Sequence, residues 1–148
     1  MNRDEIIAQL KEYFAVKELV CDHTFARYGE SSWNFLDTDY LHVLLVLRRD
    51  ILRAPMICNT KTLHQRGLRC NRCGIVSVKK TVYLSAHVLG KAGDFTVQGM
   101  TASLVRKRIK DEADKLPCQV RIEAGKSWLH IDVRPTAGRT EKVVEFYG

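Results

Sequence analysis

Strict alternation of apolar and polar side chains near the carboxyl end of the chain is the pattern that most restricts its fold. The alternation runs through Gln119–Glu123 and again through Trp128–Arg134, and Gly125-Lys126 between them suits a tight turn. Successive side chains of a β-strand point to opposite faces, so each segment has one apolar face. The apolar positions are Val120, Ile122, Leu129, Ile131 and Val133. The pattern predicts an antiparallel hairpin with one side on a core.

The opposite face of this hairpin is rich in ionisable groups, which fits either a solvated surface or a functional site. It carries Arg121, Glu123, Trp128, His130, Asp132 and Arg134. A loop of two or four residues would pair Glu123 with Trp128 and bring Glu123 close to His130. A three-residue loop would break this register, because a slip of one residue turns every side chain to the other face.

Three segments have the apolar spacing of amphipathic helices. They are Asn2–Lys11, Thr38–Arg53 and Thr101–Lys110. The middle one is the most apolar, and Pro55 lies where it would end. Its candidate caps are Asp37, Thr38 and Asp39. Thr101 is expected to cap the last helix, whose inward residues would be Leu104, Val105 and Ile109.

The remaining segments are expected to be short strands and loops. The extended ones are Met56–Asn59, Ile75–Val78, Thr81–Leu84, Phe95–Val97 and, as an edge strand or docked end, Glu141–Tyr147. Cys21–Ser32 and Thr60–Gly74 are polar and loop-like. The sequence therefore predicts one α+β domain over residues 1–148, in which a small antiparallel sheet packs against segregated helices.

Composition limits the partners and the place of synthesis. The 148 residues carry a formal net charge of +7, which favours anionic partners such as wall polymers, membrane surfaces or nucleic acid. The basic residues are spread out, without the basic stripe and interleaved aromatics of single-strand binders. No run approaches the roughly 20 apolar residues of a membrane span. The polar start MNRDEIIAQL lacks a signal-peptide core, which indicates cytoplasmic synthesis.

Five cysteines, an odd number, favour reduced thiols over a disulfide framework. Cys70 and Cys73 have the CxxC spacing of half a zinc site, and the nearest candidates for further ligands are Cys58 and His64. Because a second CxxC is missing, buried or loop thiols are favoured over a structural zinc. A redox CxxC is disfavoured, because no thioredoxin-like βαβ pattern surrounds it.

A metal-ligand pattern lies in Tyr83–Val97, where His87 precedes Asp94 and glycines between them allow a bend. With His130 of the hairpin, these residues give two imidazoles and one carboxylate. That set can hold a catalytic zinc with the fourth position open to water. The alternative for the first stretch is a hairpin with a capping aspartate and an incidental histidine.

Two motifs resemble the zinc D-Ala-D-Ala carboxypeptidase family, peptidase M15. They are Ser85-x-His87-x-x-Gly90-x-Ala92-x-Asp94 and Trp128-Leu-His130-Ile-Asp132. Two weaker similarities are Tyr13-Phe14-x-x-x-Glu18-Leu19 and Arg66-Gly-Leu-Arg69. The family includes D-Ala-D-Ala dipeptidases and phage L-alanyl-D-glutamate endopeptidases, and the Hedgehog domain shares its fold. The compact M15A-like domains of phage and bacterial proteins resemble this chain most.

The resemblance implies a zinc ion held by His87, Asp94 and His130. It also implies that Arg69 contacts a substrate carboxylate. Ser85, in the first motif, and Trp128, on the ionisable face of the hairpin, are candidate substrate-binding residues, and packing is the alternative role for Trp128. Many members carry an acidic base three residues before the last histidine, where this chain has Ser127. The replacement candidates are Glu123, which Hedgehog-type domains also place on the preceding strand, and Asp132.

The function that the resemblance implies is hydrolysis of peptidoglycan stem or cross-link peptides, as a D,D-carboxypeptidase or an endopeptidase of the phage endolysin type. Another component would deliver the protein to the cell wall. Two other functions stay open. One is a non-catalytic zinc domain of the same fold that binds wall or a protein partner, and the other is a basic nucleic-acid-binding protein with a zinc knuckle at Cys70 and Cys73.

Overall fold

The computed structural model describes residues 1–148 as an α+β fold, which confirms the predicted class. The α-helices are α1 (Arg3–Leu10), α2 (Asp22–Tyr28), α3 (Thr38–Val46), α4 (Gly74–Ser77) and α5 (Ala102–Asp111). The strands are β1 (Met56–Ile57), β2 (Ala92–Val97), β3 (Val120–Glu123), β4 (Leu129–Asp132) and β5 (Val143–Phe146). Short 3₁₀ segments are η1 (Val16–Glu18), η2 (Gly29–Phe35) and η4 (Ala113–Lys115), and η3 (Leu47–Ile51) is a π-helical turn.

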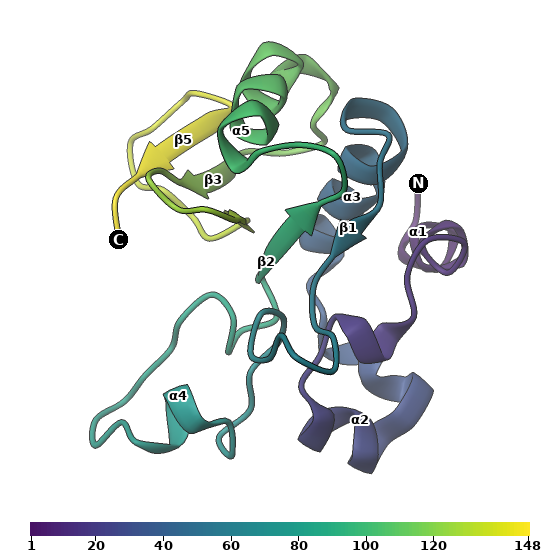
Figure 1. Ribbon diagram of the computed structural model, residues 1–148, viewed down its shortest axis with the longest axis vertical. Helices are drawn as coiled ribbons and strands as arrows, with labels where there is room; N and C mark the ends of the chain where they lie inside the picture. The colour runs from purple at the N-terminus through teal and green to yellow at the C-terminus, as the bar shows by residue number, and fades with distance from the viewer.

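The five strands form one open sheet in the order β1-β2-β4-β3-β5. All neighbours are antiparallel except β3 and β5, which run parallel (Figure 1). The predicted hairpin is present, but its register differs by two residues from the expected one. Arg121 lies opposite Asp132, so Glu123 falls opposite His130 rather than Trp128. A shift of two residues keeps every side chain on its expected face, and the predicted shared face is confirmed.

The helices begin where the sequence places acceptor side chains. Asp37 accepts a hydrogen bond from the backbone of Tyr40 at the start of α3, and Thr101 does the same for Leu104 at the start of α5. The predicted helix Thr38–Arg53 changes after Val46 into the π-helical turn η3. Leu104 was expected to face inward but is 44% exposed. The aliphatic part of Arg106 takes the buried place, and its guanidinium donates to the carbonyls of Lys126 and Trp128.

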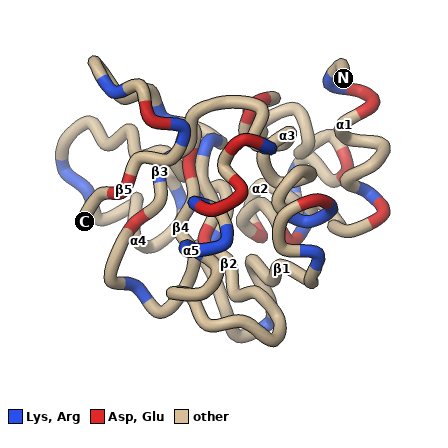
Figure 2. The backbone as a smooth tube through the Cα atoms, turned by 90° about the horizontal axis from the view of Figure 1, so that it is seen from above, with Lys and Arg blue, Asp and Glu red and all other residues tan.

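A cluster of 31 buried residues joins the helices to the apolar face of the sheet. Helix α3 lies at its centre, with α1 packed beside it, while α5 packs on β2 and β4 (Figure 1). Phe14 and Leu19, expected to dock on the core, are both buried. Basic and acidic positions are interspersed along the chain and do not gather on one side (Figure 2). None of the helices has the length and apolar character that a membrane crossing requires.

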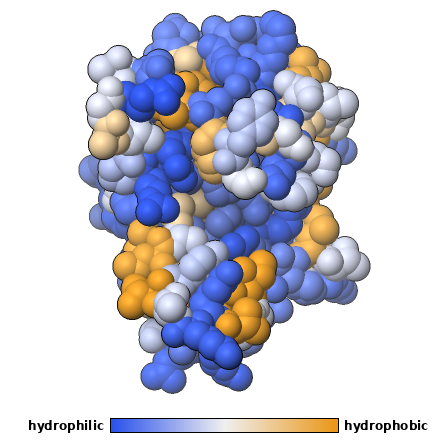
Figure 3. All heavy atoms as spheres, turned by 90° about the vertical axis from the view of Figure 1, so that its left-hand side faces the viewer, coloured by the Kyte–Doolittle hydropathy of each residue, from blue (hydrophilic) through white to orange (hydrophobic).

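Three further local predictions are wrong, and all concern segments in or near the long excursion between β1 and β2. Cys21–Ser32 is mostly helical, as α2 and η2, and Ile75–Val78 lies largely in the short helix α4. Thr81–Leu84 is not a strand, although its residues favour strands, because no neighbouring strand pairs with it. The excursion extends away from the sheet (Figure 1) and exposes apolar side chains (Figure 3), among them Val78 and Val82.

Candidate metal centre

The pairing of β2 with β4 brings two of the predicted ligands together. Asp94 of β2 lies directly opposite His130 of β4 in the antiparallel register. His87 lies in the turn just before β2 and not on a strand. Gly90 closes this turn with φ +70°, and a Cβ there would collide with the carbonyl oxygen of Phe35. The turn thus returns His87 to the edge of the sheet beside Asp94.

The donor atoms of the three residues converge on one point. Asp94 Oδ1 lies 2.8 Å from His130 Nδ1 and 3.4 Å from His87 Nε2. One donor atom from each residue lies within 4.8 Å of the others, and all three residues are buried. Two imidazole nitrogens and one carboxylate oxygen at this spacing fit a divalent metal such as zinc, with room for an exchangeable ligand.

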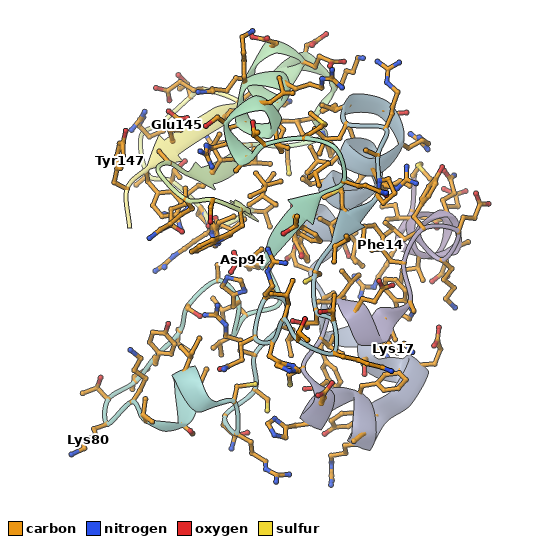
Figure 4. The ribbon with its side chains drawn as sticks, in the orientation of Figure 1. Phe14, Lys17, Lys80, Asp94, Glu145 and Tyr147 are labelled. Carbon is orange, nitrogen blue, oxygen red and sulfur yellow. The ribbon has the colours of Figure 1, made fainter.

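Each imidazole is oriented by a hydrogen bond from the ring nitrogen that does not face the centre. His87 Nδ1 donates to the Gly67 carbonyl at 2.9 Å, which leaves Nε2 free to face Asp94. His130 Nε2 lies 2.8 Å from Asp132 Oδ2, which leaves Nδ1 as the atom facing the centre. A carbonyl or carboxylate partner of this kind fixes the ring of a metal-binding histidine and makes it a better ligand. Figure 4 shows Asp94 between the sheet and the excursion that carries α4.

Asp132 is fully buried, and its oxygens are already engaged. Arg121 donates to both of them at 2.8 and 2.9 Å, and the backbone of Arg134 donates to Oδ1 at 3.0 Å. With His130 on Oδ2, the carboxylate has no free oxygen facing the pocket. Asp132, a predicted catalytic candidate, is therefore held as a hydrogen-bond partner of His130.

The charges in the centre reinforce one another when no metal is bound. Burial alone would lower the pKa of His130, but hydrogen bonds to Asp132 and Asp94 raise that pKa to about 9. Burial would raise the pKa of Asp94, yet hydrogen bonds from the two histidines hold it well below its ordinary value. A metal cation would replace the proton on His130 and take over its role of neutralising the carboxylates.

A pocket of about 290 Å³ opens onto this centre. Every site residue predicted from the sequence lines it: Arg69, Ser85, His87, Asp94, Glu123, Trp128, His130 and Asp132. Ser127, which stands where relatives of the resembled family carry an acid, is exposed and is not part of the lining. The two predicted candidates for the base, Glu123 and Asp132, lie on β3 and β4 and not in the loop between these strands.

The other predicted residues differ in the contacts that their side chains already make. Glu123 lies opposite His130 in register, and its carboxylate has one cationic neighbour, Lys126 Nζ at 3.5 Å. Arg69 Nη2 lies 3.7 Å from Asp94 Oδ2, while its Nε donates to the Gln65 carbonyl at 2.6 Å. Ser85 accepts a hydrogen bond from the backbone of Val88 and so helps to form the turn that holds His87.

Sequence reasoning did not find two residues that complete the centre. Arg121 holds Asp132 and stacks over the ring of Phe146 at 4.2 Å, and that ring contacts His130 edge-on at 5.7 Å. Arg121 could have been predicted from its position on the ionisable face of the hairpin. Phe146 could not, because it reaches the site through the parallel pairing of β5 with β3, which joins distant parts of the chain.

The CxxC pair lies in a different environment from the one expected. Cys58 was a candidate partner, but it is buried in the core, and burial raises the pKa of its thiol to about 12. His64, the other candidate, is exposed and does not join the cysteines. The residues that approach Cys70 and Cys73 are Cys21 and His23, and these four form a second group able to hold a metal.

Comparison of the chain with protein-family models, curated proteins and solved structures gave no match.

Proposed function

We propose that this protein is a zinc-dependent peptidase that hydrolyses stem or cross-link peptides of peptidoglycan. The observation that carries the proposal is the convergence of His87, Asp94 and His130 at a pocket that also holds Arg69 and Glu123. The three ligand residues and Arg69 lie in the motifs that resemble peptidase M15, whereas Glu123 lies outside them. The substrate class rests on that resemblance.

The three ligand residues suit the metal chemistry that peptide hydrolysis requires. A bound zinc ion supplies an activated water and polarises the scissile carbonyl. Asp94 contributes negative charge, while the rings of His87 and His130 are held by Gly67 and Asp132. Ligands oriented in this way keep the geometry fixed during the reaction.

Glu123 is the residue that would move the proton. Its position opposite His130 places its carboxylate at the wall of the pocket beside the metal ligands. There it would accept a proton from the attacking water and deliver it to the leaving amine, as a general base and then a general acid. Asp132 is less suited to this step because its oxygens are occupied.

Basic residues around the pocket would bind the substrate. Arg69, Lys126 and Arg134 all line it, so its rim suits a peptide with a free carboxylate. Arg69 uses Nε for the Gln65 carbonyl, which fixes the guanidinium and leaves N–H groups that can pair with a carboxylate. Trp128 lies at the same rim, and it would form a wall for the peptide chain.

A second candidate function is a non-catalytic zinc domain that binds wall or a protein partner. It is favoured by Ser127 at the usual position of the acidic base and by the ion pair of Glu123 with Lys126. Both functions use the same three ligands, so metal binding alone does not separate them.

The test is to measure metal content and the release of amines from purified peptidoglycan for the same protein preparations. The variants are His87→Ala and Glu123→Gln, with Glu145→Gln as the matched control on the exposed side of β5. A peptidase loses metal from the His87 site and activity in the first, loses activity alone in the second, and is unchanged in the control. Metal binding through His87 with no amine release from the wild type would reject the peptidase in favour of the binding domain.

A further inference from the structure

A group of sulfur and nitrogen ligands lies apart from the candidate metal centre and has no part in the proposed hydrolysis. It consists of Cys21 and His23, at the start of α2, and Cys70 and Cys73, just before α4. The two halves are about 50 residues apart in the sequence. They meet in the lower part of the molecule, where α2 and the excursion lie near each other (Figure 1).

The distances within the group are those of a tetrahedral zinc site. Cys70 Sγ lies 3.9 Å from Cys73 Sγ and 3.5 Å from His23 Nδ1, and Cys73 Sγ lies 3.9 Å from the same nitrogen. Bonds of about 2.3 Å to sulfur and about 2.0 Å to nitrogen at tetrahedral angles give about 3.8 Å between sulfurs and about 3.6 Å from sulfur to nitrogen. The Cys21 sulfur completes the group, in which all four atoms lie within 4.8 Å of one another.

The surroundings of the sulfurs also fit thiolates that hold a metal. The Thr24 hydroxyl lies 3.1 Å from Cys21 Sγ, and the Arg72 backbone N–H donates to Cys70 Sγ at 3.4 Å. Donors of this kind stabilise the charge that a thiolate keeps when it is a ligand. Cys73 is buried and Cys70 is half-buried, so the pair is not an ordinary set of surface thiols.

A disulfide explains the group less well than a metal does. The separation of 3.9 Å between the two sulfurs of the CxxC is well above the roughly 2.05 Å of a disulfide. A Cys70–Cys73 disulfide would also give no reason for Cys21 and His23 to approach. Three thiolates and one imidazole are a common donor set of structural zinc sites, in which all four positions come from the protein.

We propose that Cys21, His23, Cys70 and Cys73 bind a structural zinc ion that fastens α2 to the excursion between β1 and β2. The backbone already joins the two segments at one point, where Val20 and Leu68 form an isolated parallel bridge. The metal would add a second link between the two segments, with two ligands from each. Because all four positions are filled by protein, this zinc takes no part in the chemistry at His87.

The experiment compares zinc content and the cobalt spectrum of full-length variants. Wild type is expected to hold about two zinc ions per chain, Cys70→Ser about one, His87→Ala about one, and the double variant almost none. After replacement of zinc by cobalt, the thiolate-to-cobalt charge-transfer band is present in wild type and His87→Ala and absent in Cys70→Ser. The band reports the cysteine site alone, so the result does not depend on whether the protein is a peptidase.

Two further variants keep the test decisive if Cys70→Ser does not fold. His23→Ala removes an exposed ligand and is expected to weaken zinc retention against a chelator, whereas His23→Cys restores four ligands and retains it. Cys118→Ser, which changes a half-buried cysteine outside the group, is the matched control and keeps both ions.

The proposal is overturned by an unchanged zinc content in His23→Ala and Cys70→Ser, with no thiolate band in the cobalt protein. It is equally overturned by a Cys70–Cys73 disulfide in the freshly purified wild type, or by alkylation of these thiols at the same rate with and without a chelator.

Discussion

Replacing Asp132 by asparagine tests whether this residue positions His130 or acts as the base. Asp132 accepts from His130 and Arg121 on Oδ2 and from Arg121 and the Arg134 backbone on Oδ1. An asparagine keeps one of the two oxygens and turns an NH₂ group toward the donors of the other. At least two of these hydrogen bonds are lost whichever way the amide lies, and Arg121 loses its charge partner.

The expected result is a weaker metal site. Removal of such an orienting partner typically lowers metal affinity by about 10- to 100-fold, or about 1.4 to 2.7 kcal/mol. The value for Asp132→Asn should fall in this range, because the carboxylate is fully buried and water cannot replace the lost acceptor. The assay is competition for zinc against a chromophoric chelator, with Glu145→Gln as control.

Glu123→Gln should give the opposite pattern. Its carboxylate is not a ligand, so zinc affinity should stay within about threefold of wild type, while kcat for peptide hydrolysis should fall by about 100-fold or more. The reasoning is refuted if Asp132→Asn binds zinc as tightly as wild type but loses hydrolysis while Glu123→Gln retains it. That outcome would make Asp132 the base.

The other predictions concern the substrate contact, the stability of the core and its dependence on pH. Arg69→Lys should raise KM for a peptide with a free terminal carboxylate more than for the corresponding amide, because lysine cannot make the forked contact of an arginine with a carboxylate. Kinetics on the two substrates measure this difference, and an equal rise of KM for both would contradict the prediction. Leu44→Ala should lower the free energy of unfolding by about 2 to 5 kcal/mol in denaturant titrations, because the side chain is fully buried. The control Leu104→Ala, on the exposed face of α5, should change the free energy of unfolding by less than about 0.5 kcal/mol. Burial would raise the pKa of Asp37, but hydrogen bonds from Lys91 and the Tyr40 backbone outweigh it and lower that pKa. Asp37 therefore adds stability above its unfolded-state pKa, and this is lost as the pH falls through the lower folded-state pKa. Asp37→Asn keeps a capping acceptor but removes the charge, so it should cost about 0.5 to 1 kcal/mol at neutral pH and less near pH 3; a cost that does not shrink in acid would exclude the ion pair with Lys91 as its origin.

Local patterns predicted the parts of the fold that depend on neighbours in sequence. Alternation located the hairpin and its faces, and apolar spacing with capping residues located α1, α3 and α5. The tail, expected to be an edge strand or a docked end, is the edge strand β5, but its parallel pairing with β3 was not predicted. The helix α2 was missed, because a helix with a weak pattern forms only where tertiary contacts support it. For Thr81–Leu84 a strand was predicted that does not form, since strand propensity without a partner strand does not make a strand.

In the candidate site, too, local patterns were predictable from the sequence and contacts between distant segments were not. The residue types and spacing pointed to His87, Asp94 and His130, and the structure brings them together through the distant pairing of β2 with β4. The sequence did not indicate which carboxylate would be engaged, because the partners of Asp132 depend on the exact register of β3. It also suggested the wrong partners for the CxxC, since Cys21 approaches through the bridge of Val20 with Leu68, far away in the chain.

One short segment, Arg66–Cys70, contributes to both metal groups and explains why they lie so near each other in the fold. Its Gly67 carbonyl orients His87, its Arg69 guanidinium lies beside Asp94, and its last residue is a sulfur of the second group. The segment is held against Leu19 so closely that a Cβ on Gly67 would collide with the Leu19 carbonyl, which leaves glycine as the only residue that fits there. Its position therefore depends on a contact with the chain just before α2, next to the contact that the proposed structural zinc would fasten. A metal cross-link at Cys70 would limit the movement of Gly67 and Arg69, and the cysteine group would thus support the geometry of the candidate centre at His87 without contributing a ligand to it.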